Sequence, residues 1–377
     1  MYVAMLHSVG SDQSNWVWNW LSISSAHFET LCKYLHDNQY TSHHLNEWYE
    51  YQDDAGIRDR KKIVLTFDDG YLDNLLVAFP IMKKYGIKGT IFVNPEFVNP
   101  SENITEARNN PLGFLSWGDL RALEADHLID IQSHTMSHNF YWKSDRMIDL
   151  YTGQPDYHWL MWNLHPAKKP FSMHEDATSC IPAGYPIFEY DRALRIRRYL
   201  PDDDFLMYCS DVYQKSTFEQ KSALSVLIND LQRQQERIPG RYETDKEMES
   251  RYRYELFESK RILEEKLNKS VDYLCWPGGG YNELSLQLAE EAGYKASTYG
   301  SSDRHDYNQR HKSYKRISRF GLGSFVQLPS GFRYENNPNY LVRLFKARTG
   351  SRLTRILLKM QKEILKSSHN MKSKISQ

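Results

Sequence analysis

Two adjacent carboxylates, Asp68 and Asp69, end a segment that begins with the apolar run 63–65, and Gly70 follows them. Such a run is typical of a strand buried on both faces. Neighbouring residues on a strand point to opposite faces, so the two carboxylates can act together only where the strand becomes a loop, which glycine permits. The pattern predicts an acidic loop at the carboxyl end of a core strand, the edge where active sites of parallel α/β folds lie.

A second polar cluster follows the apolar residues 129–131 and contains His134 and His138. Four residues make about one helical turn, so both imidazoles can face the same point. Two histidines and a carboxylate form a facial set for a divalent ion, with positions left open for water and substrate. Each motif alone is common as a solvated turn or a surface pair. Together, each at the end of an apolar strand, they indicate one shared metal site.

The surrounding sequence predicts the elements that position these side chains. After Gly70, Leu75, Phe79 and Met82 recur at helical spacing, and an apolar strand follows at residues 89–93. Strand, acidic loop, helix and strand form a βαβ unit, which indicates an α/β fold.

Further strands and helices are predicted on either side of this unit. Residues 3–6 predict a first strand, and residues 316–320 predict a closing strand. Ser25 precedes a helix that reaches Leu35, and Ser116 has the character of an N-cap.

The motifs Thr-Phe-Asp-Asp-Gly and His-Thr-x-x-His resemble those of the polysaccharide deacetylase family, the NodB-type carbohydrate esterases. The resemblance implies a distorted, incomplete (β/α) barrel of the α/β class. It also implies that Asp69, His134 and His138 bind a divalent metal, most often Zn²⁺ with Co²⁺ or Ni²⁺ as alternatives. Asp68 would be the general base.

The start of the chain adds a candidate general acid. Met-Leu-His-Ser-Val is similar to the Tyr-His-x-Val start of many family members, and one branch uses a histidine of this strand as the acid. His7 is therefore the residue expected to protonate the leaving amine, and a core histidine bonded to backbone is the alternative. His305 and His311 lie in a polar stretch and rank below His7.

A glycine-rich segment, Cys275-Trp-Pro-Gly-Gly-Gly280, stands where the family's third motif is expected. Cys275 falls at the position of an arginine that orients the general base in the family, Pro277 matches, and Gly278 replaces a tyrosine. The missing arginine indicates a variant branch or reduced activity. We expect the Gly278 N–H to stabilise an oxyanion, with Trp276 and Pro277 binding substrate beside it; a plain glycine turn is the alternative.

Two long segments surround this motif. Residues 140–240 are irregular and rich in aromatic residues and proline, which predicts an insertion that covers the substrate. Residues 219–267 are charged at helical spacing and predict a long solvated helix without chemistry. The expected organisation is a catalytic domain at 1–338 and a basic amphipathic tail at 339–377.

Composition narrows the partners and the compartment. The chain has 48 basic and 48 acidic residues, so no overall field attracts nucleic acid. Its start lacks the pattern of a signal peptide and its four cysteines are scattered, so a cytoplasmic protein is expected. The tail at 339–377 either lies on an anionic membrane surface or docks on the protein or a partner.

The function implied by these patterns is metal-dependent removal of N-acetyl groups from an amino sugar, in a precursor of a bacterial surface polysaccharide. The substrate is then an N-acetylated glycan or a lipid-linked sugar. Two alternatives are a metal-dependent hydrolase of a non-sugar amide or ester, and a carbohydrate-binding protein without turnover.

Overall fold

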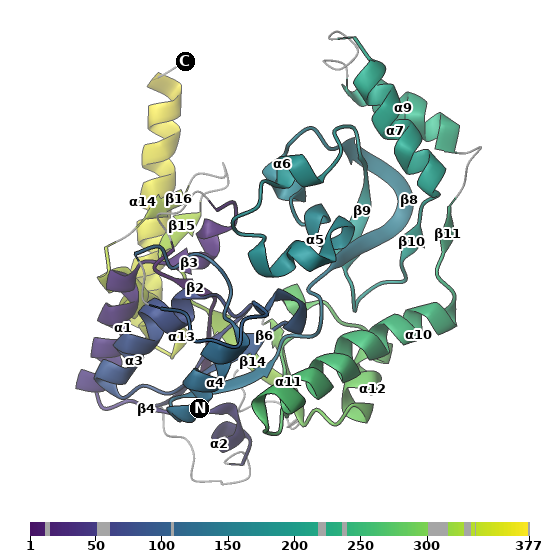
Figure 1. Ribbon diagram of the computed structural model, residues 1–377. Coiled ribbons are helices and arrows are strands. Elements are labelled where there is room, and N and C mark those ends of the chain that lie inside the picture. The colour runs from purple at the N-terminus through teal and green to yellow at the C-terminus, as the bar shows by residue number, and fades with distance from the viewer. Residues whose placement is uncertain are drawn as a thin grey trace. The chain divides into compact units, whose positions relative to one another are not determined.

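Seven parallel strands pair into a closed sheet around the core; Figure 1 labels β6 and β14 among them. The computed structural model describes residues 1–11, 16–50, 61–106, 109–217, 224–235, 240–300, 316–327, 333–335 and 337–375. In the order of the ring, the strands are β1 (Tyr2–Leu6), β14 (Arg316–Gly321), β13 (Ala296–Gly300), β12 (Tyr273–Leu274), β7 (Ile129–Ser133), β6 (Gly89–Val93) and β5 (Lys62–Phe67). Strand β1 also pairs with β5, which closes the ring, and β4 (Thr41–Ser42) pairs with the other edge of β5. This is the expected (β/α) barrel, which is incomplete because its ring has seven strands and not eight.

The register of β1 and β5 explains where the first candidate residues lie. Leu6 is level with Phe67, the last residue of β5, and Phe67 is level with Ile91 in β6. The three strands therefore end at the same edge of the sheet. The apolar residues of β5 are almost fully buried, as predicted for a strand covered on both faces, and in β1 the same holds for Val3, Ala4 and Leu6.

The chain divides into two compact units. One comprises Met1–Phe92, Ser101–Ile131 and Thr298–Gln377, and the other comprises Val93–Pro100 and Gln132–Ser297. The boundaries fall within β6, within β13 and within β7, so these strands contribute residues to both units.

The first unit contains the helices of the βαβ segment and the C-terminal helices. Its other elements are β2 (Ser8–Val9), η1 (Asn19–Leu21), β3 (Ser22–Ile23), α1 (Ser25–Asp37), α2 (Leu45–Glu50), η3 (Asn74–Ala78), α3 (Phe79–Tyr85), α4 (Trp117–Ala125), β15 (Phe325–Gln327), β16 (Arg333–Glu335), α13 (Asn339–Arg348) and α14 (Arg352–Ile375). The N-cap of α1 is Ser24, one residue before the predicted Ser25, because the Ser24 hydroxyl accepts the His27 N–H. The predicted cap at Ser116 is confirmed, as a capping box with Asp119.

The second unit contains the aromatic segment and the charged helices. Its other elements are η4 (Pro95–Phe97), β8 (Phe140–Leu150), η5 (Pro155–Tyr157), α5 (Leu160–Leu164), η6 (Pro166–Phe171), α6 (Ala177–Cys180), β9 (Pro186–Arg192), β10 (Tyr199–Leu200), α7 (Asp203–Lys215), α9 (Leu224–Gln235), β11 (Arg241–Tyr242), α10 (Asp245–Arg253), η7 (Tyr254–Glu258), α11 (Ser259–Leu267), η8 (Pro277–Gly279) and α12 (Glu283–Glu291). The long helix predicted within the charged segment 219–267 is confirmed, since α10, η7 and α11 run on continuously to Leu267. Strand β11 precedes it, so the helix does not extend over the whole segment.

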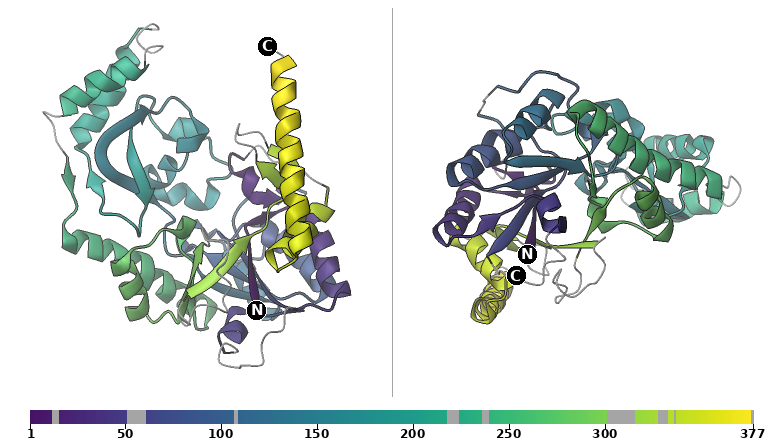
Figure 2. Two further views of the ribbon diagram at one scale, coloured as in Figure 1. Left: turned by 180° about the vertical axis from the view of Figure 1, so that it is seen from behind. Right: turned by 90° about the horizontal axis from the view of Figure 1, so that it is seen from below.

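The last two helices belong to the first unit and differ in burial. In α13, Leu341 and Phe345 are fully buried, and the Phe345 ring packs against Tyr34 of α1. Helix α14, which ends at the C-terminus in Figure 2, exposes most of its apolar residues. In the described part of the chain, no helix has the length and hydropathy required to span a bilayer.

A buried acid fixes the loop after β1 to the helix after β5. The Asp73 carboxylate accepts the hydroxyl groups of Ser8 and Ser11, the latter at 2.8 Å, and its side chain is fully buried. Burial raises the pKa of Asp73 to about 7, against the opposing effect of the two serine hydroxyls.

We predict that stability depends on pH through Asp73. Between its ordinary value of 3.8 and about 7, the folded protein retains a proton that the unfolded chain has released. The free energy of unfolding therefore falls as pH rises through this window, by a few kcal/mol at about 1.4 kcal/mol per pKa unit. Replacing Asp73→Asn should flatten the curve measured by chemical denaturation, whereas the exposed Asp37→Asn control should not. Parallel curves for wild type and Asp73→Asn would contradict this.

Candidate functional site

The acidic pair lies where the sequence predicted, in the loop that follows β5. Asp68 is 4% exposed and its N–H donates to the Leu6 carbonyl at 3.0 Å, so β1 fixes its backbone. Asp69 has a φ of +74° and Gly70 has +69°, which turns the chain away from the strand. The Asp69 carboxylate accepts the Tyr71 hydroxyl at 2.9 Å. The two carboxylates therefore have different surroundings: Asp68 is buried at the end of the sheet, and Asp69 contacts Tyr71 within the loop.

Asp68 forms a buried ion pair with an arginine that the sequence analysis did not single out. Arg319, on β14, donates from its two terminal nitrogens to the two oxygens of Asp68, at 2.6 and 2.9 Å. It also donates to the Thr66 hydroxyl and lies over the Phe92 ring. A two-pronged pair of this kind fixes the plane of the carboxylate and compensates its charge. The arginine missing at position 275 thus has a counterpart on another strand.

His7 lies at the end of β1, close to the same carboxylate. Its Nε2 is 3.9 Å from Asp68 Oδ2, which is too long for a hydrogen bond. The side chain is 21% exposed, whereas that of Asp68 is 5% exposed, so the histidine has access to solvent. Both roles considered for His7, proton transfer at the site and a core histidine bonded to backbone, fit this position. The role of His7 stays a prediction.

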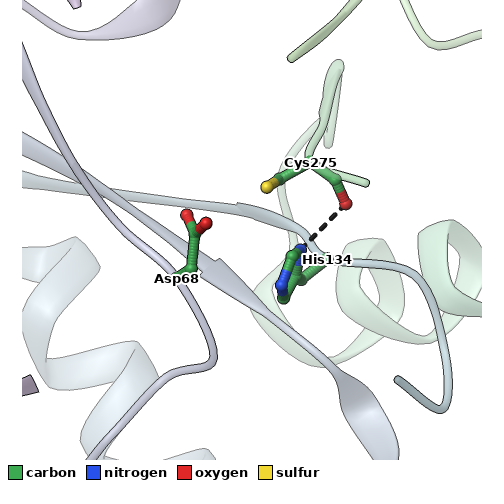
Figure 3. A group of neighbouring side chains, drawn as sticks. All are labelled: Asp68, His134 and Cys275. Atoms are coloured by element: carbon green, nitrogen blue, oxygen red, sulfur yellow. Dashed lines mark hydrogen bonds between the residues drawn. The ribbon is translucent and has the colours of Figure 1, made fainter. Parts of the chain in front are cut away.

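His134 and His138 follow β7 in a loop, and the predicted helical turn between them is wrong. Thr135 and His138 have φ values of +64° and +53°, left-handed angles that an α-helix does not contain. The imidazoles still converge, with ring centroids 5.2 Å apart. His134 is buried, and its Nδ1 donates to the Cys275 carbonyl at 2.8 Å (Figure 3), which leaves Nε2 as a lone-pair donor.

Positive φ angles are concentrated in the two motifs. Of the six non-glycine residues with positive φ in the described chain, three are Asp69, Thr135 and His138. For a β-branched residue such as Thr135 this conformation is strained. Residues held in this way are concentrated at functional sites because the surrounding structure must impose them.

Two buried charged residues determine the conformation of the loop that contains His134 and His138, called here the histidine loop. Glu255, on η7, accepts the N–H groups of Met136 and Ser137 at 3.1 and 3.0 Å and also the Ser137 hydroxyl. Burial raises the pKa of Glu255. Glu255 belongs to the helical segment predicted to be purely solvated. The sequence pattern does not reveal its role, because a single inward-facing residue does not alter a pattern of surface charge.

The aromatic segment supplies the second of these residues. Lys169, on η6, is fully buried, and its ammonium donates to the Ser137 carbonyl at 2.9 Å and to Asn139 Oδ1 at 2.7 Å. It also forms an ion pair with Glu96. The loop is thus held by elements far from it in sequence, which a local motif does not reveal.

The glycine-rich segment after β12 forms the turn predicted from its composition. Gly278 has a φ of +54°, which favours glycine. Trp276 is 2% exposed and packs on Tyr281, so its side chain stabilises the turn. The proposed substrate contacts of Trp276, Pro277 and Gly278 stay predictions, and His305 and His311 lie outside the described residues.

Two groups of side chains in the described residues have the composition of a cation site. One is Asp69, His134 and His138; the other is Asp68, His134 and Cys275, drawn in Figure 3. Both oxygens of Asp68 accept hydrogen bonds from Arg319, and a cation would have to compete with that guanidinium. The first group is therefore the one that the chemistry favours.

The parallel barrel and the aspartate–histidine group define a class: α/β proteins with a candidate metal centre at the carboxyl ends of the strands. The family model described as "Polysaccharide deacetylase" matches residues 55–151 and 240–297. The unmatched stretch between them lies within the predicted insertion. Two segments that together make up about two fifths of the chain thus match the polysaccharide deacetylase family.

Individual relatives agree with this assignment. YxkH of Bacillus subtilis strain 168, a protein named for polysaccharide deacetylase activity, is 32% identical over 136 residues, which are 36% of this chain and 42% of that protein. The match thus spans less than half of that relative's length.

Solved structures of low sequence identity share the fold. A de-N-acetylase from Aggregatibacter actinomycetemcomitans has a TM-score of 0.52 at 16% identity, over 84% of this chain and 93% of that one. The deacetylase domain of BpsB from Bordetella bronchiseptica has a TM-score of 0.51 at 16% identity, over 85% and 95%.

We predict that Arg319 and Asp68 are energetically coupled. Replacing Arg319→Met removes the guanidinium that compensates a buried carboxylate, and breaking a buried ion pair from one side typically costs about 3–5 kcal/mol of unfolding free energy. In an Asp68→Asn background the same replacement should cost clearly less, because no buried charge is then left behind. Chemical denaturation of the four proteins of this double-mutant cycle measures the coupling. Equal costs in both backgrounds would contradict the assigned role.

Proposed function

We propose that the protein is a metal-dependent deacetylase that removes N-acetyl groups from an amino sugar of a bacterial surface-polysaccharide precursor. The observation that carries the proposal is the pair of motifs, Asp68-Asp69-Gly70 after β5 and His134 to His138 after β7, in a chain of this family. The substrate class rests on the family and on the chemistry of the donor set.

Asp69, His134 and His138 are the proposed metal ligands, and Zn²⁺ is the most suitable ion, with Co²⁺ or Ni²⁺ as alternatives. Two imidazoles and one carboxylate are typical of catalytic zinc sites, which keep a position open. The ion, when bound, would lower the pKa of a water and polarise the acetyl carbonyl. The Nδ1–H of His134 is already directed at a backbone carbonyl, so its Nε2 is presented for coordination.

Strand β6 supports the convergence of the two motifs. Ile91 is level with the last residue of β5, and two residues further along β6 the Val93 carbonyl accepts the His134 N–H at 2.9 Å. Adjacent parallel strands end at one edge, where active sites of such sheets lie.

The protein groups then divide the proton transfers. Asp68, whose plane Arg319 fixes, is the proposed general base that takes a proton from the attacking water. His7 is the proposed acid that delivers a proton to the departing sugar amine, and the Gly278 N–H is the proposed donor to the oxyanion of the tetrahedral intermediate. The products are acetate and a free amino sugar.

Arg319 bears on the alternatives. A binding protein without turnover was suggested by the missing arginine at position 275, and the guanidinium of Arg319 on Asp68 removes that reason. A hydrolase of simple amides or esters uses the same residues and remains the second candidate. Acetate release from N-acetylated oligosaccharides, compared with release from simple acetyl esters, separates the two.

We predict distinct effects for substitutions in the two acids. Asp69→Ala should abolish metal binding, measured by elemental analysis of protein purified without chelators, because it removes one of three ligands. Asp68→Asn should keep the metal and lose nearly all acetate release, typically by 10²-fold or more, because it removes the base. The exposed Asp37→Asn variant is the control for both measurements. A fully active Asp68→Asn protein, or one Asp69→Ala protein that retains metal, would contradict these roles.

A second observation favours a membrane-associated protein. In α14, an exposed apolar face consists of Leu353, Ile356, Leu357, Met360 and Ile364, each at least half exposed. The face that packs against α13 is a different one, since Leu358 and Leu365 contact Tyr340. An exposed apolar face of this kind is typical of a surface that contacts a membrane or another protein.

The charge of α14 favours an anionic lipid surface as that contact. Its basic residues include Arg352, Arg355, Lys359, Lys362 and Lys366, and its only acid in the described residues is Glu363. A basic amphipathic helix lies in the interface of anionic bilayers, and the cytoplasmic leaflet is anionic. The four cysteines are free thiols, as expected for a reducing compartment. We therefore propose a peripheral position at the inner face of the cytoplasmic membrane.

We predict that full-length protein sediments with vesicles rich in phosphatidylglycerol and that high salt weakens this binding. Replacing Leu353, Ile356 and Met360 by Gln should reduce binding at least tenfold, because burial of the apolar face is lost. Replacing the exposed Val226 of α9 by Gln is the matched control. A triple variant that binds like wild type would exclude α14 as the contact. Removing residues 339–377 is a poorer test, because α13 is part of the core.

A further inference from the structure

An arginine of the aromatic segment lies against the glycine-rich turn. Arg192 is the last residue of β9 and is level with Phe140, the first residue of β8. Its guanidinium lies over the Phe140 ring, 4.4 Å from the centroid. The stacking holds the planar group in one orientation and compensates part of its charge.

The glycines of the turn provide the space for this side chain. A Cβ at Gly278 would lie 2.2 Å from Arg192 Nε and 2.4 Å from Nη2, and a Cβ at Gly280 would lie 2.3 Å from Arg192 Cβ. Any other residue at these positions would displace the arginine. Gly278, which stands where the family has a tyrosine, therefore makes room for a guanidinium.

Among the described residues, no carboxylate lies close enough to Arg192 to form an ion pair, although Asp191 opposes the lowering of its pKa. The neighbouring carboxylate of Asp191 pairs instead with Arg195, at 3.4 Å. The Nε of Arg192 is buried and makes no hydrogen bond within the described chain. Burial lowers the pKa of the Arg192 guanidinium, which reflects the cost of this position. A half-buried cation with an unused donor is stabilised when an anion binds it.

A small cavity connects Arg192 to the histidine loop. It is lined by Thr135, His138, Asn139, Arg192, Ala193, Leu194, Glu255, Pro277 and Gly280. Its volume of about 10 Å³ is the space that one water-sized oxygen occupies. The Thr135 hydroxyl is buried there and makes no hydrogen bond in the described chain, so it is a second unused donor. Both oxygens of Glu255 are engaged by residues 136 and 137.

We propose that Arg192, with Thr135, binds a carboxylate group beside the proposed metal site. The inference rests on the proposed function and deepens it, because it names the chemistry of the group that the segment around β9 recognises. Arginine presents a planar fork that matches a carboxylate, and one carboxylate oxygen fits the cavity. Two sources share this chemistry: the acetate released by deacetylation and the carboxylate of an acidic sugar in the glycan.

The test is binding, measured by isothermal titration of full-length protein with sodium acetate and with sodium glucuronate, and with glucose as the neutral probe. Metal-free protein is titrated beside metal-loaded protein, so that coordination of acetate to a metal is separated from binding to Arg192. We expect Arg192→Gln to weaken carboxylate binding at least tenfold and Arg192→Lys to weaken it less, because lysine keeps the charge without the fork. Arg195→Gln, in the same segment, is the control and should bind like wild type.

The outcomes discriminate. Binding of acetate alone identifies a product site, and binding of glucuronate alone identifies an acidic glycan. Wild-type protein that binds neither anion, an Arg192→Gln variant that binds like wild type, or an equal loss in Arg195→Gln would each overturn the inference. Because the readout is binding, absence of acetate release from any glycan would refute the proposed function without affecting this result.

Discussion

The buried ion pair between Asp68 and Arg319 is the constraint on which the proposed site depends. A carboxylate that is 4% exposed is unstable as an isolated charge, and here Arg319 of β14 reaches past β1 to compensate Asp68, which follows β5. The pair links the beginning of the barrel to its end, since Arg319 follows Asp68 by about two thirds of the chain. Closure of the sheet through β1 therefore also completes the surroundings of Asp68, the proposed base.

In the second unit, buried charged residues likewise determine the conformation of the histidine loop. A loop with positive φ at Thr135 and His138 is not stable by local preference, and Glu255 and Lys169 supply the hydrogen bonds that hold it. Both side chains are buried, and their hydrogen bonds to polar groups of the loop offset the cost of removing the charges from water. In this region, buried charged residues fix the backbone that carries the two proposed metal ligands, His134 and His138.

The sequence was sufficient for features that local pattern encodes. The apolar runs predicted β5 and β6, and the two motifs at strand ends predicted that Asp69, His134 and His138 come together in a group that could hold a cation. It was insufficient where the partner is distant: Arg319 was a plain strand residue and Glu255 one charge among many. The helical interpretation of His134 to His138 failed for the same reason, because tertiary hydrogen bonds, and not local propensity, determine that backbone.

The most direct test of the central claim is restoration of acetate release by metal. Protein stripped with a chelator would be incubated with an N-acetylated oligosaccharide, with and without one equivalent of Zn²⁺, Co²⁺ or Ni²⁺, and acetate would be quantified. We expect no release from stripped protein and recovery of release on addition of one of these ions. Release that is equal with and without metal, or no release from any N-acetylated glycan under either condition, would contradict it.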